Sequence, residues 1–279
     1  MNGFFKSLLQ MFSYTFLIRA FIVGILVSLC ASLLGVSLVL KRYSMIGDGL
    51  SHVGFGALAI ATVCNAAPLA VAVPVVVVAA FLLLRLNAHS RVGGDAAIAM
   101  ISTGALAIGV MAVSITTGVN TDIYNYMFGS ILAMGSQDVI VSVILSVVVL
   151  ILFVLFYHQL FAVTFDESFA QATGTRVGLY NSLIAVLTAV TIVLGMRMMG
   201  AMLISALIIF PALTSMRVFG SFKAVTVNAA VVSVVCFVVG LIISYFCAAP
   251  AGASVVLVHI VAFLAYAAVG MLRRKFYKG

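Results

Sequence analysis

The chain has 279 residues, of which 65% are hydrophobic and 7% charged, and its mean hydropathy is +1.35. Because a soluble domain carries about 25% charged residues, this composition excludes a soluble fold and indicates an all-α, polytopic integral membrane protein. The net charge of +8 does not indicate nucleic-acid binding, since no basic stretch is interleaved with aromatic residues.

Apolar segments follow one another along the whole chain. Since a spanning helix needs about 20 apolar residues, they predict a single transmembrane domain, a helical bundle of eight to nine spans. The N-terminal stretch lacks the order of regions found in a cleaved signal peptide, so we expect an uncleaved lead-in to the first span. The expected spans are residues 16–40, 50–66, 68–86, 96–116, 137–160, 179–195, 199–216, 224–247 and 250–271.

The basic residues orient these spans. With nine spans and a cytoplasmic C-terminus, eleven of the 14 Lys and Arg residues fall on the cytoplasmic side and three fall outside. The eleven are Lys41, Arg42, Arg85, Arg91, Arg176, Arg217, Lys223, Arg273, Arg274, Lys275 and Lys278, and the three are Lys6, Arg19 and Arg197. This excess predicts an outside N-terminus and an inside C-terminus.

Residues 47–52, Gly-Asp-Gly-Leu-Ser-His, carry the sharpest functional signal. Asp48 and His52 are four residues apart, so in a helix they lie on one face about one turn apart. Ionisable groups in a membrane mark pathways or binding sites, and oxygen with nitrogen ligands suits a divalent transition metal. The pair therefore predicts a cation path. In the alternative interpretation, Asp48 caps a helix that starts near residue 50, and His52 bonds a neighbouring carbonyl.

The loop at 161–180 is the second informative stretch. Asp166 and Glu167 predict the start of a short helix over about 165–176, because acidic side chains favour a helix N-terminus. Ala170 is small, and Gly174 is a natural stop. The charge pattern places this helix in the cytoplasm, as a docking element for a motor subunit or as a connector lying on the lipid headgroups.

Several catalytic motifs are missing from the sequence. It contains no P-loop, no His-Glu-x-x-His and no Gly-x-Ser-x-Gly. We therefore expect no enzymatic activity and no cofactor of its own, and any ATP must be bound and hydrolysed by another chain. His259 stands alone in the last span, where it is either a hydrogen bonder between helices or a ligand. Residues 56–60 recur as 104–108, which we attribute to chance in so apolar a chain.

Four segments resemble, in order, motifs of the bacterial ABC-type zinc, manganese and iron permeases. Residues 47–52 follow a first span and a basic turn, and resemble that family's Gly-Asp-Ala-Leu/Ile-Ser-His. Residues 126–132 are similar to its Phe-Gly-Ser-Ile-Leu segment. Residues 166–174 resemble its Asp-x-x-x-Ala-x-x-x-Gly cytoplasmic helix, and residues 203–212 its Leu-Val-x-Ala-Leu-Leu-Ile-x-Pro-Ala span.

This resemblance implies the permease subunit of an ATP-binding-cassette importer in a bacterial plasma membrane. The cargo it implies is a divalent transition metal ion, with zinc or manganese favoured and iron admitted. The implied partners are a cytoplasmic ATP-binding subunit, an extracytoplasmic metal-binding protein and a second copy of the chain in a homodimer. It assigns the metal path to Asp48 and His52, and the coupling to the ATPase to Asp166, Glu167, Ala170 and Gly174.

The sequence departs from the family pattern at two places. Gly49 stands where the family has alanine, and no proline follows His52. The alternative function, from another class, is an ATP-independent secondary transporter for a small solute or ion that uses its few acidic residues as proton relays.

Overall fold

The computed structural model describes residues 13–89, 94–117 and 135–276. Within these ranges the chain is helical and contains no strand. The helices are α2 (Thr15–Leu40), α3 (Ser44–Val63), α4 (Pro68–His89), α5 (Gly94–Thr117), α7 (Ser136–Leu155), α8 (Tyr157–Phe165), α9 (Glu167–Ala172), α10 (Val177–Met199), α11 (Ala201–Met216), α12 (Phe222–Cys247) and α13 (Ala251–Phe276).

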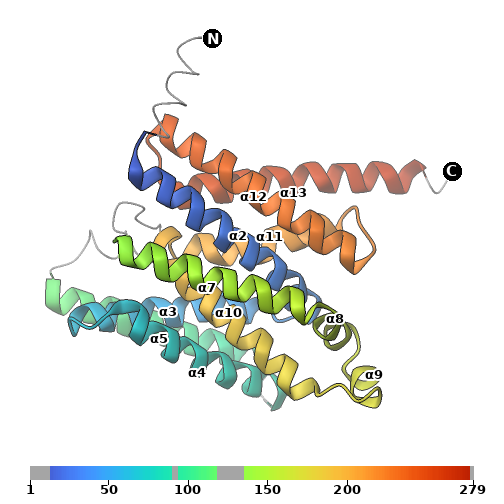
Figure 1. Ribbon diagram of the computed structural model, residues 1–279, viewed down its shortest axis with the longest axis horizontal. Coiled ribbons are helices and arrows are strands. Elements are labelled where there is room, and N and C mark those ends of the chain that lie inside the picture. Colours follow the sequence, from blue (N-terminus) through green and yellow to red (C-terminus); the bar gives the residue numbers. More distant parts are fainter. Residues whose placement is uncertain (1–12, 90–93, 118–134, 277–279) are drawn as a thin grey trace, which may run out of the picture.

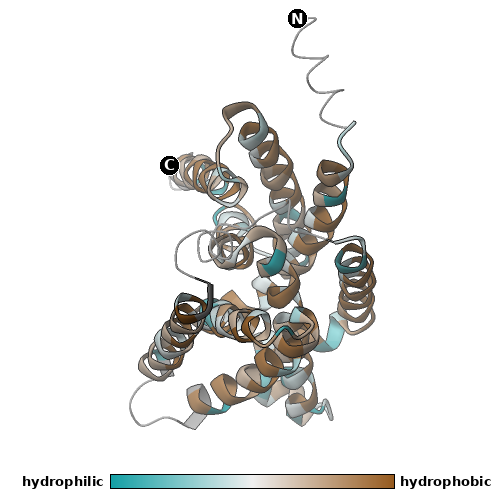
Figure 2. Ribbon diagram, turned by 90° about the vertical axis from the view of Figure 1, so that its left-hand side faces the viewer, coloured by the Kyte–Doolittle hydropathy of each residue, from teal (hydrophilic) through white to brown (hydrophobic). Residues whose placement is uncertain are grey.

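Eight of the helices in the described ranges are long and apolar enough to cross a membrane, and α11, with 16 residues, is shorter. Apolar residues dominate these helices (Figure 2). The two short helices α8 and α9 lie together at one end of the bundle, at the right of Figure 1. The expected all-helical polytopic fold is therefore confirmed.

Helix α3 lies at the centre of the bundle. In its most apolar stretch 72% of the residues are buried, against 11% for α13. One continuous cluster of buried side chains joins α3 to α2, α10 and α11, and includes Leu58, Leu34, Ile192 and Leu207. Most of the residues of α3 are therefore packed against other helices.

Three expected boundaries differ from the structure. Helix α3 begins at Ser44, not near residue 50, so it includes a polar first turn that hydropathy alone passes over. The expected span 137–160 is divided at Phe156, where α7 ends and α8 turns away. Helix α10 continues to Met199, and the single residue Gly200 joins it to α11.

Two segments discussed above lie outside the described residues. They are residues 126–132, which carry one of the four resemblances, and the N-terminal lead-in up to residue 12.

A close backbone contact joins α3 to α5. A Cβ atom added at Gly56 would lie 2.6 Å from the carbonyl oxygen of Ala105, and one added at Gly109 would lie 2.9 Å from the Cα atom of Gly56. Lipid tails are as apolar as side chains, so helices associate in a bilayer through such close backbone packing. Gly104, the counterpart of Gly56 in the repeated pentapeptide, has open space around it. The repeat therefore does not reflect a repeated packing role.

These two glycines give a matched stability test. We expect Gly56→Ala to destabilise the protein by about 1–3 kcal/mol, because backbone atoms must move to accept the methyl group. Gly104→Ala adds the same methyl group to open space and removes a helix glycine, so it should leave stability unchanged or raise it by up to about 1 kcal/mol. Thermal unfolding of both variants in detergent measures the difference, and equal melting temperatures would contradict this packing.

Candidate metal site

Asp48 and His52 lie inside α3 rather than at its end. The residue that precedes the helix is Tyr43, and Asp48 follows it by more than one turn. The interpretation of Asp48 as a cap is therefore wrong. The two side chains face the same way, with 3.7 Å between Asp48 Oδ2 and His52 Nε2. They are partly open, since 43% of the Asp48 side chain and 29% of the His52 side chain are exposed.

Two cavities meet at this pair. The α11-side cavity has a volume of about 220 Å³ and is lined by Asp48, Ser51, His52, Phe55, Leu106, Ala201, Met202 and Ser205. The α5-side cavity has a volume of about 180 Å³ and is lined by Met45, Asp48, His52, Ile98, Ala99, Ser102, Thr103 and Leu106. Asp48, His52 and Leu106 line both cavities. Because polar groups and room for water occur together, a cation at the pair would keep part of its hydration.

The geometry of the pair suits a shared cation better than a direct bond. At 3.7 Å, Asp48 Oδ2 and His52 Nε2 are too far apart for a hydrogen bond. Two ligand atoms about 2.1 Å from a tetrahedral metal ion are about 3.4 Å apart, so a small closure would bring both into range. The Nδ1 atom of His52 is buried and finds no hydrogen-bond partner among the described residues. The carbonyl partner expected in the alternative interpretation is thus not found there.

The part of the chain that the structure describes contains no group of three or more His, Cys, Asp or Glu side chains placed to hold a metal ion. Among the described residues, Asp48 and His52 are therefore the two side chains of these types that a metal ion at this site could contact. Hydroxyl and thioether groups also line the cavities, and the sequence interpretation assigned none of them; they are Ser51, Ser102, Thr103, Ser205, Met45 and Met202.

The first turn of α11 closes one side of the site. The Ser205 hydroxyl donates to Ser51 Oγ at 3.1 Å, and Ser51 donates to the Asp48 carbonyl at 2.7 Å. Gly200, directly before α11, is buried and has φ 83° and ψ 161°, a region that only glycine adopts readily. The polar face of α3 thus contacts the start of α11. The backbone turn that leads into α11 depends on Gly200.

Helix α5 closes the other side, and the contact explains one departure from the family pattern. A Cβ atom at Gly49 would lie 2.7 Å from Ser102 Oγ and 2.8 Å from a methyl carbon of Ile98. The glycine therefore lets these two side chains approach α3 next to Asp48. No feature of the sequence around Ser102 signals this position.

The short helix expected in the loop at 161–180 is present as α9. Asp166 Oδ1 accepts a hydrogen bond from the Phe169 amide at 2.9 Å, and Gly174 ends the turn with φ 86°. Ala170 is fully buried, whereas Phe165 and Phe169 are exposed. The helix spans Glu167–Ala172, which is shorter than the expected 165–176.

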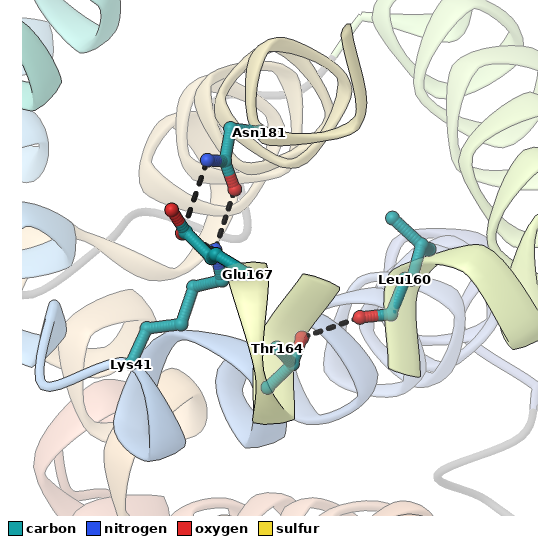
Figure 3. A network of polar contacts seen from close by, with 5 residues as sticks. All are labelled: Lys41, Leu160, Thr164, Glu167 and Asn181. Atoms are coloured by element: carbon teal, nitrogen blue, oxygen red, sulfur yellow. Dashed lines mark hydrogen bonds and ion pairs between the residues drawn. The ribbon is translucent and has the colours of Figure 1, made fainter. Parts of the chain in front are cut away.

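Glu167 is the residue of α9 with the most polar contacts (Figure 3). Its Oε1 accepts hydrogen bonds from Lys41 Nζ at 2.6 Å and from Asn181 Nδ2 at 3.1 Å. Partial burial acts to raise the pKa of Glu167, but these hydrogen bonds and the charge of Lys41 outweigh it and lower the pKa below its usual value. The carboxyl group is therefore ionised at neutral pH.

His259 does not join the site. Its ring is fully buried in α13 and its Nδ1 donates to the Val255 carbonyl of the same helix at 2.9 Å. The expected hydrogen bond between helices is not made, and Nε2 has no partner among the described residues.

The eight long apolar helices among the described residues define a multi-pass membrane protein. The sequence model of the ABC 3 transport family matches residues 13–270. The chain therefore belongs to this family of transport proteins. It is 30% identical to the manganese transport system membrane protein MntC of Halalkalibacterium halodurans over 249 residues, 89% of this chain and 85% of that protein.

Two further proteins are similar over most of their length. The high-affinity zinc uptake system membrane protein ZnuB of Haemophilus influenzae is 30% identical over 244 residues, 88% of this chain and 94% of ZnuB. The solved structure of PsaBC from Streptococcus pneumoniae in complex with Fab matches with a TM-score of 0.84 at 29% identity, covering 95% of this chain and 94% of that one.

The glycine between α10 and α11 can be tested directly. We expect Gly200→Ala to cost about 1–3 kcal/mol, since an L side chain is strained at this φ and ψ. Gly178→Ala is the matched control, because it lies in α10 with open space around it. Thermal unfolding should separate the two variants, and a Gly200→Ala protein as stable as Gly178→Ala would contradict the observed turn.

Proposed function

We propose that this chain is the membrane permease subunit of an ATP-driven importer of divalent transition metal ions, and that Asp48 and His52 form its metal path. The observation that carries the proposal is the placement of this pair between two cavities, on the helix that is most enclosed by the bundle. An acid and a histidine at such a position are costly in a membrane protein, which favours a functional role.

The ligand types favour a first-row divalent metal. Asp48 offers an anionic oxygen and His52 a neutral nitrogen, a combination that admits zinc, manganese and iron. Family members named for zinc and for manganese transport support cargo of this class. Two protein ligands with water in the other positions give a site that holds an ion briefly and releases it, as transport requires.

The remaining machinery belongs to other chains in this proposal. A separate cytoplasmic ATP-binding subunit binds and hydrolyses ATP, and it docks on α9 through the segment Asp166, Glu167, Ala170 and Gly174. An extracytoplasmic metal-binding protein delivers the ion, and two copies of the permease form a homodimer. The exposed Phe165 and Phe169 support docking at α9, since they offer an apolar surface at the end of the bundle that the charge pattern places inside.

Uptake of metal into proteoliposomes tests the site. With the ATP-binding subunit, the metal-binding protein and ATP present, we expect Asp48→Asn and His52→Ala each to reduce zinc or manganese uptake at least about tenfold, by removing a charge or a ligand. Asp95→Asn and His158→Ala are the controls, because both residues are exposed and neither lines one of the two cavities. Uptake unchanged in both site variants would rule out this assignment.

The same assay distinguishes the alternative class of protein. An importer of the proposed kind accumulates metal only with ATP inside the vesicles, whereas a secondary transporter accumulates it with an ion gradient alone. Gradient-driven uptake that is indifferent to ATP would replace the proposal with the secondary transporter.

The role of α9 is tested at its buried alanine. We expect Ala170→Leu to displace the helix, because the site is fully buried, and to reduce ATP-driven uptake severalfold while metal binding to the permease is retained. Ala170→Ser keeps a small side chain and should retain most of the uptake. Full uptake by Ala170→Leu would show that transport does not depend on the seating of α9.

A further inference from the structure

Three polar side chains from distant parts of the chain form a closed network at the end of the bundle (Figure 3). Lys41 Nζ donates to Glu167 Oε1 at 2.6 Å and to Asn181 Oδ1 at 2.5 Å, and Asn181 Nδ2 donates to the same Glu167 oxygen at 3.1 Å. Lys41 ends α2, Glu167 begins α9 and Asn181 lies in α10. The network therefore ties the proposed docking helix to two spanning helices.

Lys41 is the enclosed member of the network. Only 5% of its side chain is exposed, whereas 49% of the Glu167 side chain is exposed. A buried ammonium is costly unless its donors are satisfied, so Lys41 holds Glu167 and Asn181 in place more strongly than a surface ion pair would. Loss of either acceptor leaves a buried charge with fewer partners.

A rigid turn connects Lys41 to the start of α3. The amide of Arg42 donates to the Val39 carbonyl at 3.1 Å and that of Tyr43 to the Leu38 carbonyl at 2.7 Å, the pattern of a Schellman motif. Arg42 has φ 60°, a conformation that non-glycine residues hold only when neighbouring bonds fix it. The Tyr43 carbonyl then accepts the Ile46 amide at 2.9 Å in the first turn of α3.

The network and the turn together link α9 to the proposed metal path. Asp48 follows Lys41 by seven residues, and the amides of Arg42, Tyr43 and Ile46 between them are hydrogen-bonded. The Lys41 ammonium also lies 5.8 Å from the centre of the Tyr43 ring. A displacement of Glu167 therefore reaches the helix that carries Asp48 and His52 without crossing a flexible loop.

We propose that Lys41 is a positioning residue that transmits movement of α9 to α3, so that its contacts with Glu167 and Asn181 couple ATP hydrolysis to the opening of the metal path. The inference rests on the proposed docking of the ATP-binding subunit at α9. In this inference, the contacts of Lys41 with Glu167 and Asn181 pass a movement of the docked α9 on to the helix that carries Asp48 and His52.

The measurement is the number of metal ions moved per ATP hydrolysed by the assembled complex in proteoliposomes. We expect Lys41→Met to lower this ratio roughly fivefold or more, with complex assembly, melting temperature and binding of zinc or manganese to the permease unchanged. The charge swap Lys41→Glu with Glu167→Lys restores an ion pair and should recover part of the ratio. Lys223→Met is the control, because Lys223 is an exposed lysine at the same end of the bundle, in the first turn of α12.

Two results would overturn the inference. One is an unchanged ratio in Lys41→Met, and the other is a loss of assembly or stability that accounts for the whole loss of uptake. Ala170→Leu separates this failure from failure of the proposed function. Uptake lost in Ala170→Leu but kept in Lys41→Met would leave α9 as the docking helix and remove Lys41 from the coupling path, whereas uptake kept in both would reject docking at α9 itself.

Discussion

The backbone contact between α3 and α5 is the constraint on which the site depends. Gly56 brings α3 against the Ala105 carbonyl, which fixes how α3 is rotated about its axis. Gly56, His52 and Asp48 are spaced by four residues and share one face of the helix. At Gly56 this face lies directly against the backbone of α5. One and two turns earlier the same face carries His52 and Asp48, and there the two cavities separate the helices.

This arrangement reconciles ionisable groups with an apolar bundle. A charge surrounded by packed hydrocarbon pays a large desolvation cost, but Asp48 and His52 both open to cavities and remain partly exposed. The neighbouring polar groups are also satisfied, since Ser205, Ser51 and the Asp48 carbonyl form a chain of hydrogen bonds between α11 and α3. The protein thus keeps cavities and polar atoms on one face of its most enclosed helix.

Composition and local pattern predicted the helical class, the approximate spans and the pairing of Asp48 with His52, because these depend on hydropathy and on the helical period. They also predicted that a short helix starts at Asp166 and Glu167 and ends near Gly174, which depends on neighbouring residues. The long-range contacts around the Asp48–His52 pair and around α9 could not be predicted in this way. Ser205 reaches Ser51, and Lys41 reaches Glu167, across more than 120 residues of sequence, and such pairings are set by how helices pack rather than by periodicity.

In the proposed metal path, a set of only two acid and histidine ligands among the described residues favours transport over storage. A structural zinc site uses four protein ligands and a catalytic one uses three, and outer hydrogen bonds hold these ligands in place. Here the described residues offer one acid and one histidine 3.7 Å apart on a helix whose start is tied to α9 through Lys41. A small rotation or shift of α3 changes the separation of these ligands from the groups on α5 and α11 that line the same cavities. Because affinity depends on the number of ligands, we infer that such a movement in the proposed metal path changes how tightly an ion is held.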